Sequence, residues 1–334
     1  MNASMRKLYF LVPGTTGRFG GGGLWAELNT YKLATKICEA EIVTYRQRES
    51  DRAFLADLLP RCEPDSAIFT VGWGFDVPQI VSKLSRQNII YHAHSAGYNF
   101  SLPAKVPIIT VSRNTMGYWG EKAANSLIYY LPNQISDEFY NLNRPRDIEI
   151  LVQTRKSSEY LLQQLIPALQ QKYRVEIIDS YVVDLAELFN RSQIYLYDSA
   201  EYWATSGVTE GFGLPPLEAL ACGCRVFSSV NHGLSDYLDP GFNCQKIAGY
   251  SLQYDLLRIE RALQLSAPPP LNWLAEYRGD RLVSRLEKIL TEINLFFDCQ
   301  NTLENRIAGL SSWRIRQRKI ERLWSKVQRR LNSN

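Results

Sequence analysis

The chain has 334 residues, of which 45% are hydrophobic and 22% charged, and its formal net charge at pH 7 is +4. This length fits two domains of about 150 residues each, with full hydrophobic cores. No segment approaches the roughly 20 apolar residues of a membrane-spanning helix, and the six cysteines are too scattered for a disulfide framework or a zinc site. We therefore expect a cytoplasmic protein in a reducing compartment.

In the first half, short β-rich runs alternate with helical patterns, as in βαβ units with parallel sheets. The expected strands are residues 7–12, 41–45, 67–71, 88–93, 106–111 and 127–131. Four glycines, Gly20 to Gly23, follow the first strand and precede a helix expected over residues 24–38. Such a run is typical of a mobile lid.

The second half repeats this architecture. Its expected strands are residues 148–152, 174–178, 193–197 and 225–228. We predict a first domain over residues 1–133, a polar linker over 134–147, a second domain over 148–296 and a helical tail over 297–334. Open α/β sheets bind ligands beyond the carboxyl ends of their strands, so two such domains facing each other define one cleft.

The most informative segment runs from Glu210 to Val226 and reads Glu-Gly-Phe-Gly-Leu-Pro-Pro-Leu-Glu-Ala-Leu-Ala-Cys-Gly-Cys-Arg-Val. Gly211 and Gly213 allow a tight turn, and the prolines that follow suit the first turn of a helix. The backbone amides around Phe212, Gly213 and Leu214 should therefore point at whatever lies before the helix. A helix N-terminus of this kind suits a phosphate.

Glu218 is expected in the first turn of that helix, where its carboxylate can reach a ligand hydroxyl. The alternative is that it only complements the helix dipole. Gly223 is expected to end the helix before the strand at residues 225–228.

The complete segment resembles the Glu-x7-Glu signature of retaining glycosyltransferases of the family-4 type, which have the GT-B fold. The resemblance extends to residues 184–197 before the motif, to 228–238 after it, and to the Pro-Asn pair at 132–133, which is similar to an interdomain segment of the family. In all, residues of about 6–265 can be laid on the family pattern. This implies two Rossmann-like domains with parallel sheets facing each other across a cleft, the acceptor on the first domain and a nucleotide-sugar donor on the second.

The resemblance also implies roles for charged residues. Glu210 would face the hydroxyls of the transferred sugar and Glu218 the nucleotide ribose. Arg155, at the end of the strand at 148–152, matches a phosphate-binding arginine; a surface arginine is the alternative. The family normally adds a lysine where this chain has Tyr160, and Lys156 is the candidate to supply that charge.

His94 matches a histidine that the resemblance places against the transferred sugar, whereas strand alternation points His92 away from His94. The resemblance makes Gly22 and Gly23 part of a loop that closes over the donor phosphates or the acceptor, and a purely mobile lid is the alternative. The segment leading to Glu210 is longer than is usual in the family. Its aromatic Tyr202 and Trp203 would either stack on a sugar face or pack against the next helix.

No Asp-x-Asp motif lies at a strand end, so we expect no obligatory metal and no cofactor besides the donor substrate. The implied activity is that of a retaining, hexosyltransferase-type enzyme. It would move a sugar from a nucleotide diphosphate sugar to a hydroxyl of a glycan or lipid-linked acceptor, in polysaccharide or cell-envelope glycan synthesis. A catalytically degenerate sugar-binding or scaffold module is the alternative, supported by Tyr160. No nucleic-acid partner is expected.

The tail combines charge with an apolar stripe. Residues 311–334 carry eight basic residues and one Glu, a net charge of +7, so the rest of the chain is near −3. Within Trp313 to Leu331, the residues Trp313, Ile320, Leu323, Trp324, Val327 and Leu331 recur at helical spacing. Two interpretations stay open: a basic helix lying on the anionic inner face of a membrane, or a helix that crosses back to the first domain.

Overall fold

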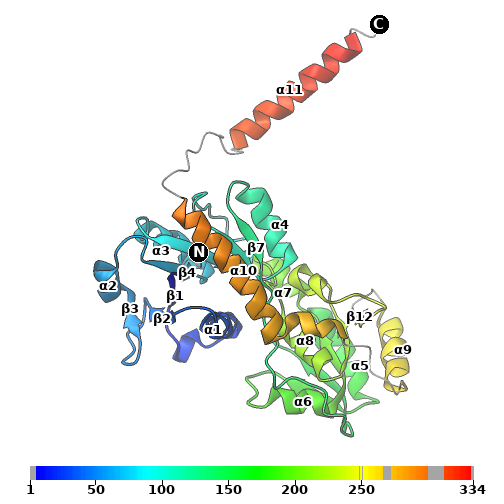
Figure 1. Cartoon of the computed structure of the whole chain (residues 1–334). Helices are drawn as coiled ribbons and strands as arrows, with labels where there is room; N and C mark the ends of the chain where they lie inside the picture. Colours follow the sequence, from blue (N-terminus) through cyan, green and yellow to red (C-terminus); the bar gives the residue numbers. More distant parts are fainter. Residues whose placement is uncertain (1–4, 248, 250, 266–271, 300–311, 332–334) are drawn as a thin grey trace.

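The computed structural model describes residues 5–247, 249, 251–265, 272–299 and 312–331 (Figure 1). The first domain is built on a seven-stranded parallel sheet of order β3-β2-β1-β4-β5-β6-β7. Its strands are β1 (Lys7–Val12), β2 (Ala40–Thr44), β3 (Ala53–Phe54), β4 (Ala67–Val71), β5 (Asn88–Ala93), β6 (Ile108–Thr110) and β7 (Ile128–Tyr130). Its α-helices are α1 (Gly22–Ala34), α2 (Leu55–Leu58), α3 (Val77–Lys83) and α4 (Arg113–Lys122).

The second domain is built on a five-stranded parallel sheet of order β12-β11-β10-β8-β9. Its strands are β8 (Ile148–Gln153), β9 (Val175–Ile178), β10 (Ser192–Tyr197), β11 (Arg225–Ser228) and β12 (Cys244–Lys246). Its α-helices are α5 (Ile166–Gln170), α6 (Leu185–Arg191), α7 (Ala200–Ser206), α8 (Leu214–Ala221) and α9 (Leu252–Leu263). A π-helix (Leu161–Leu165) precedes α5, and 3-10 helices lie at His232–Asp236 and Asn272–Tyr277.

Both sheets contain strands that are buried on both faces. All side chains of β4 and β5 are buried, and all but one in β1 and β10. Continuous apolar runs of this kind are typical of parallel sheets covered by helices on both faces. All ten predicted strands are present, and the short β3 and β12 were not predicted from the sequence.

The long helix α10 (Gly279–Asp298) belongs by packing to the first domain, although its sequence position follows the second. Its apolar face lies on the first sheet and α1, and the joint core contains Leu8, Phe10, Leu33, Ile68, Ile90, Ile109, Leu131, Leu282, Leu286, Ile289, Leu290, Ile293 and Phe297. The segment 148–296, which was predicted as the second domain, therefore includes a helix that crosses back to the first domain. The helix that crosses is α10, not the tail predicted as one candidate.

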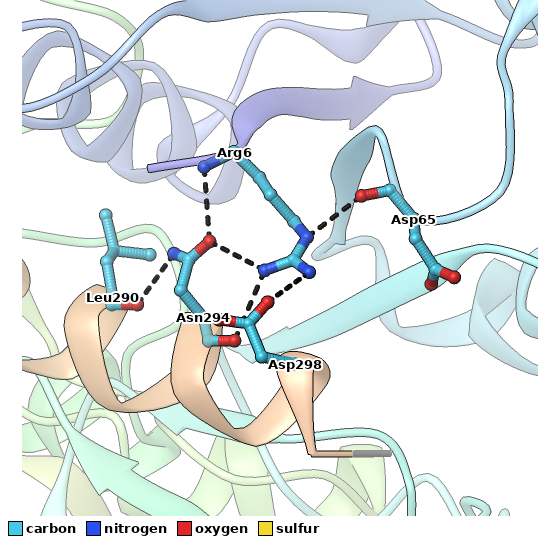
Figure 2. A network of polar contacts seen from close by, with 5 residues as sticks. All are labelled: Arg6, Asp65, Leu290, Asn294 and Asp298. Carbon is cyan, nitrogen blue, oxygen red and sulfur yellow. Dashed lines mark hydrogen bonds and ion pairs between the residues drawn. The ribbon is translucent and has the colours of Figure 1, made fainter. Parts of the chain in front are cut away.

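A polar network fastens the end of α10 to the first domain (Figure 2). The Arg6 guanidinium donates hydrogen bonds to the backbone oxygen and to Oδ1 of Asn294, both at 3.2 Å, and pairs with Asp298 at 2.5 Å. Arg6 Nε also donates to the backbone oxygen of Asp65 at 2.9 Å. The start of β1 and the last turns of α10 are thus joined by several bonds.

The tail forms helix α11 (Ser312–Leu331), which stands apart from both domains in Figure 1. The apolar side chains at 313, 315, 320, 323, 324 and 327 are exposed, including 73% of Trp313 and 65% of Trp324. None of the helices in the described ranges has the length and apolarity needed to cross a bilayer.

Candidate active site

A cavity of about 360 Å³ lies between the two domains. The carboxyl ends of β5 and β8 and the starts of α1 and α8 meet around it, as expected for facing parallel sheets. It is lined by Gly22, Gly23, Ala26, His94, Ser95, Tyr98, Asn133, Gln153, Arg155, Lys156, Tyr197, Trp203, Thr209, Glu210, Gly211, Phe212, Gly213, Leu214 and Pro215. Every predicted site residue except Glu218 therefore borders one cavity.

The start of α8 forms one wall of this cavity. Gly213 precedes the helix with φ +75°, a left-handed conformation that favours glycine. A Cβ there would also lie 2.3 Å from Cδ2 of Leu234. Pro215 lies in the first turn, where its missing N–H costs nothing. The helix therefore presents its free amides and positive dipole end at the cavity.

Two adjacent cations border the same space. Arg155 is exposed, and within the described residues it has no carboxylate partner. Lys156 has φ +67°, which turns the chain so that its ammonium lies 4.2 Å from the ring centre of Trp203. Burial lowers the pKa of Lys156, the charge of Glu210 opposes this effect, and Arg155 adds to it.

Glu210 is buried beneath these cations. Its Oε2 accepts hydrogen bonds from the hydroxyls of Tyr197 at 2.9 Å and Ser199 at 3.0 Å, and from Nε1 of Trp203. Across the described chain, no group donates to Oε1. One carboxylate oxygen is thus fixed by three donors, and the other remains available to a ligand hydroxyl.

The insertion before Glu210 forms α7 and contacts the first domain directly. The Ser95 hydroxyl donates to the backbone oxygen of Thr209 at 2.7 Å, and the Ala96 amide donates to Oγ1 of Thr209 at 2.9 Å. Gly211 passes so close to the first domain that a Cβ would lie 1.5 Å from the backbone oxygen of His94. Glycine is therefore required where the domains meet. Trp203 borders the cavity and its ring contacts Tyr202 within the same helix α7, so stacking on a sugar and packing against the next helix both stay predictions.

Gly22 and Gly23 lie in the first turn of α1, not in a loop before a helix at residue 24 as predicted. Their placement at a helix N-terminus beside the cavity favours amide contact with an anion over a mobile lid.

The prediction that His92 points away from His94 was wrong. Both rings contact the same oxygen of Glu27: Nδ1 of His92 lies 2.6 Å from Oε2, and Nε2 of His94 lies 2.5 Å from it. The prediction misapplied strand alternation, which places residues two apart on the same face, and the two rings do share a face at the end of β5 (Asn88–Ala93). Sequence reasoning missed Glu27; its only signal is a carboxylate on the mostly apolar buried face of α1.

Glu218 departs from its predicted position. Since α8 begins at Leu214, Glu218 is its fifth residue and lies beyond the first turn. Burial, followed by the charge of Glu138, raises the pKa of Glu218 to about 8. The side chain borders no part of the cavity described above. A carboxylate this far along the helix gains little from the dipole.

Tyr160 does not take the place of a phosphate-binding lysine. Its hydroxyl donates to Oδ2 of the buried Asp255 at 2.8 Å, on helix α9. The cations at the cavity are therefore Arg155 and Lys156.

Residues 143–253 match the family glycosyl transferases group 1. This segment contains both glutamates of the motif, Arg155 and Lys156. The match covers about a third of the chain. The resemblance found in the sequence is confirmed for the broad group of glycosyl transferases. The family-4 type and the retaining mechanism stay predictions. No curated protein sequence matches the chain.

Solved structures share the arrangement of both domains. A glycosyltransferase from Rickettsia africae ESF-5 is 12% identical, with 87% of this chain and 99% of that chain covered and a TM-score of 0.60. HepE from Anabaena, in complex with UDP and glucose, is 15% identical, with 89% and 100% covered and a TM-score of 0.54. Sucrose-phosphate synthase from Thermosynechococcus elongatus is 15% identical, with 89% and 98% covered and a TM-score of 0.52. The predicted GT-B fold is confirmed.

Proposed function

We propose that the protein is a retaining glycosyltransferase that moves a sugar from a nucleotide diphosphate donor to a hydroxyl of a glycan or glycolipid. The observation that carries this proposal is one cavity bordered by a helix N-terminus, two cations and a buried carboxylate. The positive groups suit a diphosphate, and the free oxygen of Glu210 suits a sugar hydroxyl. The HepE structures that share the fold contain UDP or UDP-glucose, which makes these the first ligands to test.

In the proposed reaction, the bond between the sugar C1 and the diphosphate oxygen breaks, and the acceptor oxygen bonds to C1 on the same face. The acceptor proton passes to an oxygen of the leaving diphosphate. Arg155, Lys156 and the amides of α8 would stabilise the charge that grows on the diphosphate, because they are fixed in place before the reaction. Glu210 would orient the sugar and is not assigned as a nucleophile.

A panel of nucleotide sugars incubated with purified protein tests this proposal. NMR of the sugar released to water identifies its first-formed anomer. We expect slow hydrolysis of at least one donor, with the anomeric configuration kept. Binding of a nucleotide diphosphate without turnover would favour the degenerate sugar-binding alternative, and inversion would contradict retention.

We further propose that α11 brings the enzyme to a lipid-linked acceptor at an anionic membrane. Packing needs an apolar stripe but gives no reason for the net charge of +7 on residues 311–334. The exposed tryptophans of α11 support this interpretation. Sedimentation with anionic and with neutral vesicles should show binding to the anionic ones at low salt. A protein that stays in the supernatant with anionic vesicles at low salt would contradict it.

A further inference from the structure

Glu27 joins two histidines behind the wall of the cavity. Its side chain is 5% exposed, and its Oε2 contacts Nδ1 of His92 and Nε2 of His94 at 2.6 and 2.5 Å. The two rings lie 4.2 Å apart between centres. Gly72 closes the cluster, since a Cβ there would lie 3.0 Å from Oε2 of Glu27 and 3.3 Å from Cδ2 of His94. The three side chains therefore form one tightly packed unit.

The position of each proton follows from the chemistry of the contacts. Burial alone would raise the pKa of Glu27, but the hydrogen bonds and charges of the two histidines lower it to about 2. An ionised carboxylate only accepts hydrogen bonds, so each contacting nitrogen must carry a proton. His92 is thus protonated on Nδ1 and His94 on Nε2. Burial, and then the charge of His92, lower the pKa of His94, which leaves its Nδ1 without a proton near neutral pH.

The second ring nitrogen of His94, Nδ1, is a hydrogen-bond acceptor without a donor among the described residues. This nitrogen is buried. Buried acceptors without a donor are uncommon in native proteins and call for an explanation. His94 borders the cavity that Glu210 and Arg155 also border. The exposed part of the ring, rather than Nδ1 itself, is what a sugar bound in the cavity would contact.

We propose that Glu27 is a positioning residue that holds the His94 ring, with its proton on Nε2, at the wall of the cavity, where the ring lies against the transferred sugar. His92 contacts the same oxygen of Glu27 and so holds that oxygen in place. The role of the sugar rests on the proposed glycosyl transfer, whereas the proton positions do not.

A bound metal ion is the alternative for this cluster, because one ligand atom from each side chain lies within 4.8 Å of the others. Two observations favour hydrogen bonding instead. Ligands around a tetrahedral zinc ion lie about 3.4 Å from one another, given metal–ligand distances of about 2.0–2.2 Å. The contacts at Glu27 are much shorter. Zinc-bound histidines also donate their second N–H to a partner, and here neither His92 Nε2 nor His94 Nδ1 has one among the described residues.

Long-range proton–nitrogen NMR of protein labelled with nitrogen-15 in histidine is the direct test, because the chain has only three histidines. We expect protonation on Nδ1 for His92 and on Nε2 for His94. His232 serves as an internal control, since its Nδ1 accepts the Glu210 amide at 3.3 Å. In Glu27→Gln, the amide donates to one of the two rings, so at least one of their signals should change while that of His232 does not.

Turnover and UDP affinity of Glu27→Gln separate positioning from general damage. We expect kcat for the accepted nucleotide sugar to fall by roughly tenfold to a hundredfold, the effect of a misplaced contact. The affinity for UDP should not change, because UDP lacks the sugar.

Three results would overturn the inference: a proton on Nδ1 of wild-type His94, wild-type turnover in Glu27→Gln, or a shift of both His92 and His94 signals on adding one equivalent of Zn²⁺. The last would assign the cluster to a metal. Failure of the wild-type protein to turn over any donor would contradict the proposed function, while the spectra still decide the proton positions.

Discussion

Replacing Glu218 by Gln should make the protein more stable at neutral pH and weaken its binding of the donor. The pKa of this carboxyl is about 8 in the folded protein, against an ordinary value of 4.5 for a glutamate. Folding therefore favours the protonated form. The associated stability is fully present below pH 4.5 and is lost as the pH rises through 8. At pH 7.5 the shift corresponds to about 4 kcal/mol, and about half of this remains after allowance for the partial exposure of the side chain.

Urea unfolding at two pH values measures this effect. Since Gln cannot ionise, we expect Glu218→Gln to exceed the wild type in free energy of unfolding by about 2 kcal/mol at pH 7.5 and by only a few tenths at pH 5. Glu138→Gln is the matched control, because it removes only the second cause of the raised pKa and should stabilise less. A variant that is less stable than wild type at both pH values would refute this reasoning and assign Glu218 to helix stabilisation.

Calorimetry tests the functional half of the same prediction. If the ionised carboxylate accepts the ribose hydroxyls, UDP binding should release a proton near pH 7, seen as a heat that depends on the buffer. The loss of one charged hydrogen bond should weaken UDP binding to Glu218→Gln by about 1.5–3 kcal/mol. Unchanged affinity would remove Glu218 from the donor site.

Other variants test the cavity wall. Arg155→Ala should lower kcat by roughly a hundredfold, with a smaller effect on donor affinity, since its charge acts on the leaving diphosphate. Lys156→Ala should lower kcat less than Arg155→Ala does, because the Lys156 ammonium also contacts the Trp203 ring. Wild-type kinetics in both variants would place the phosphates elsewhere. Trp203→Phe removes one of three donors to Glu210 and should lower kcat/KM about tenfold, a loss of roughly 1.4 kcal/mol. Tyr202→Phe is its control and should behave as wild type.

The sequence predicted the sheets well because buried parallel strands are continuous apolar runs, of which β4 and β5 are examples. It missed β3 and β12, which have only two and three residues. It also placed α10 with the second domain, because chain order does not tell which sheet covers the apolar face of a helix. The two strands were missed because they are short, and α10 was assigned to the wrong domain because its position depends on tertiary packing.

Within the site, local chemistry was predictable and distant partners were not. The turn at Gly213 and the helix that follows were expected from glycine and proline alone. The helix begins at Leu214, however, which moves Glu218 out of the first turn. The contact of Glu27 with His94 joins residues 67 apart in the chain. No local pattern specifies such a pair, because it depends on how α1 lies on the sheet.

The return of α10 to the first domain limits how the two halves of the molecule can separate. The chain passes between the domains twice, once after β7 and once before α10, and the end of α10 is fastened to Arg6. Two connections leave rotation about the line that joins them as the easiest motion, whereas a single linker would allow twisting and sliding as well. Each opening and closing should therefore return the cations of one half to the same place opposite the histidines of the other.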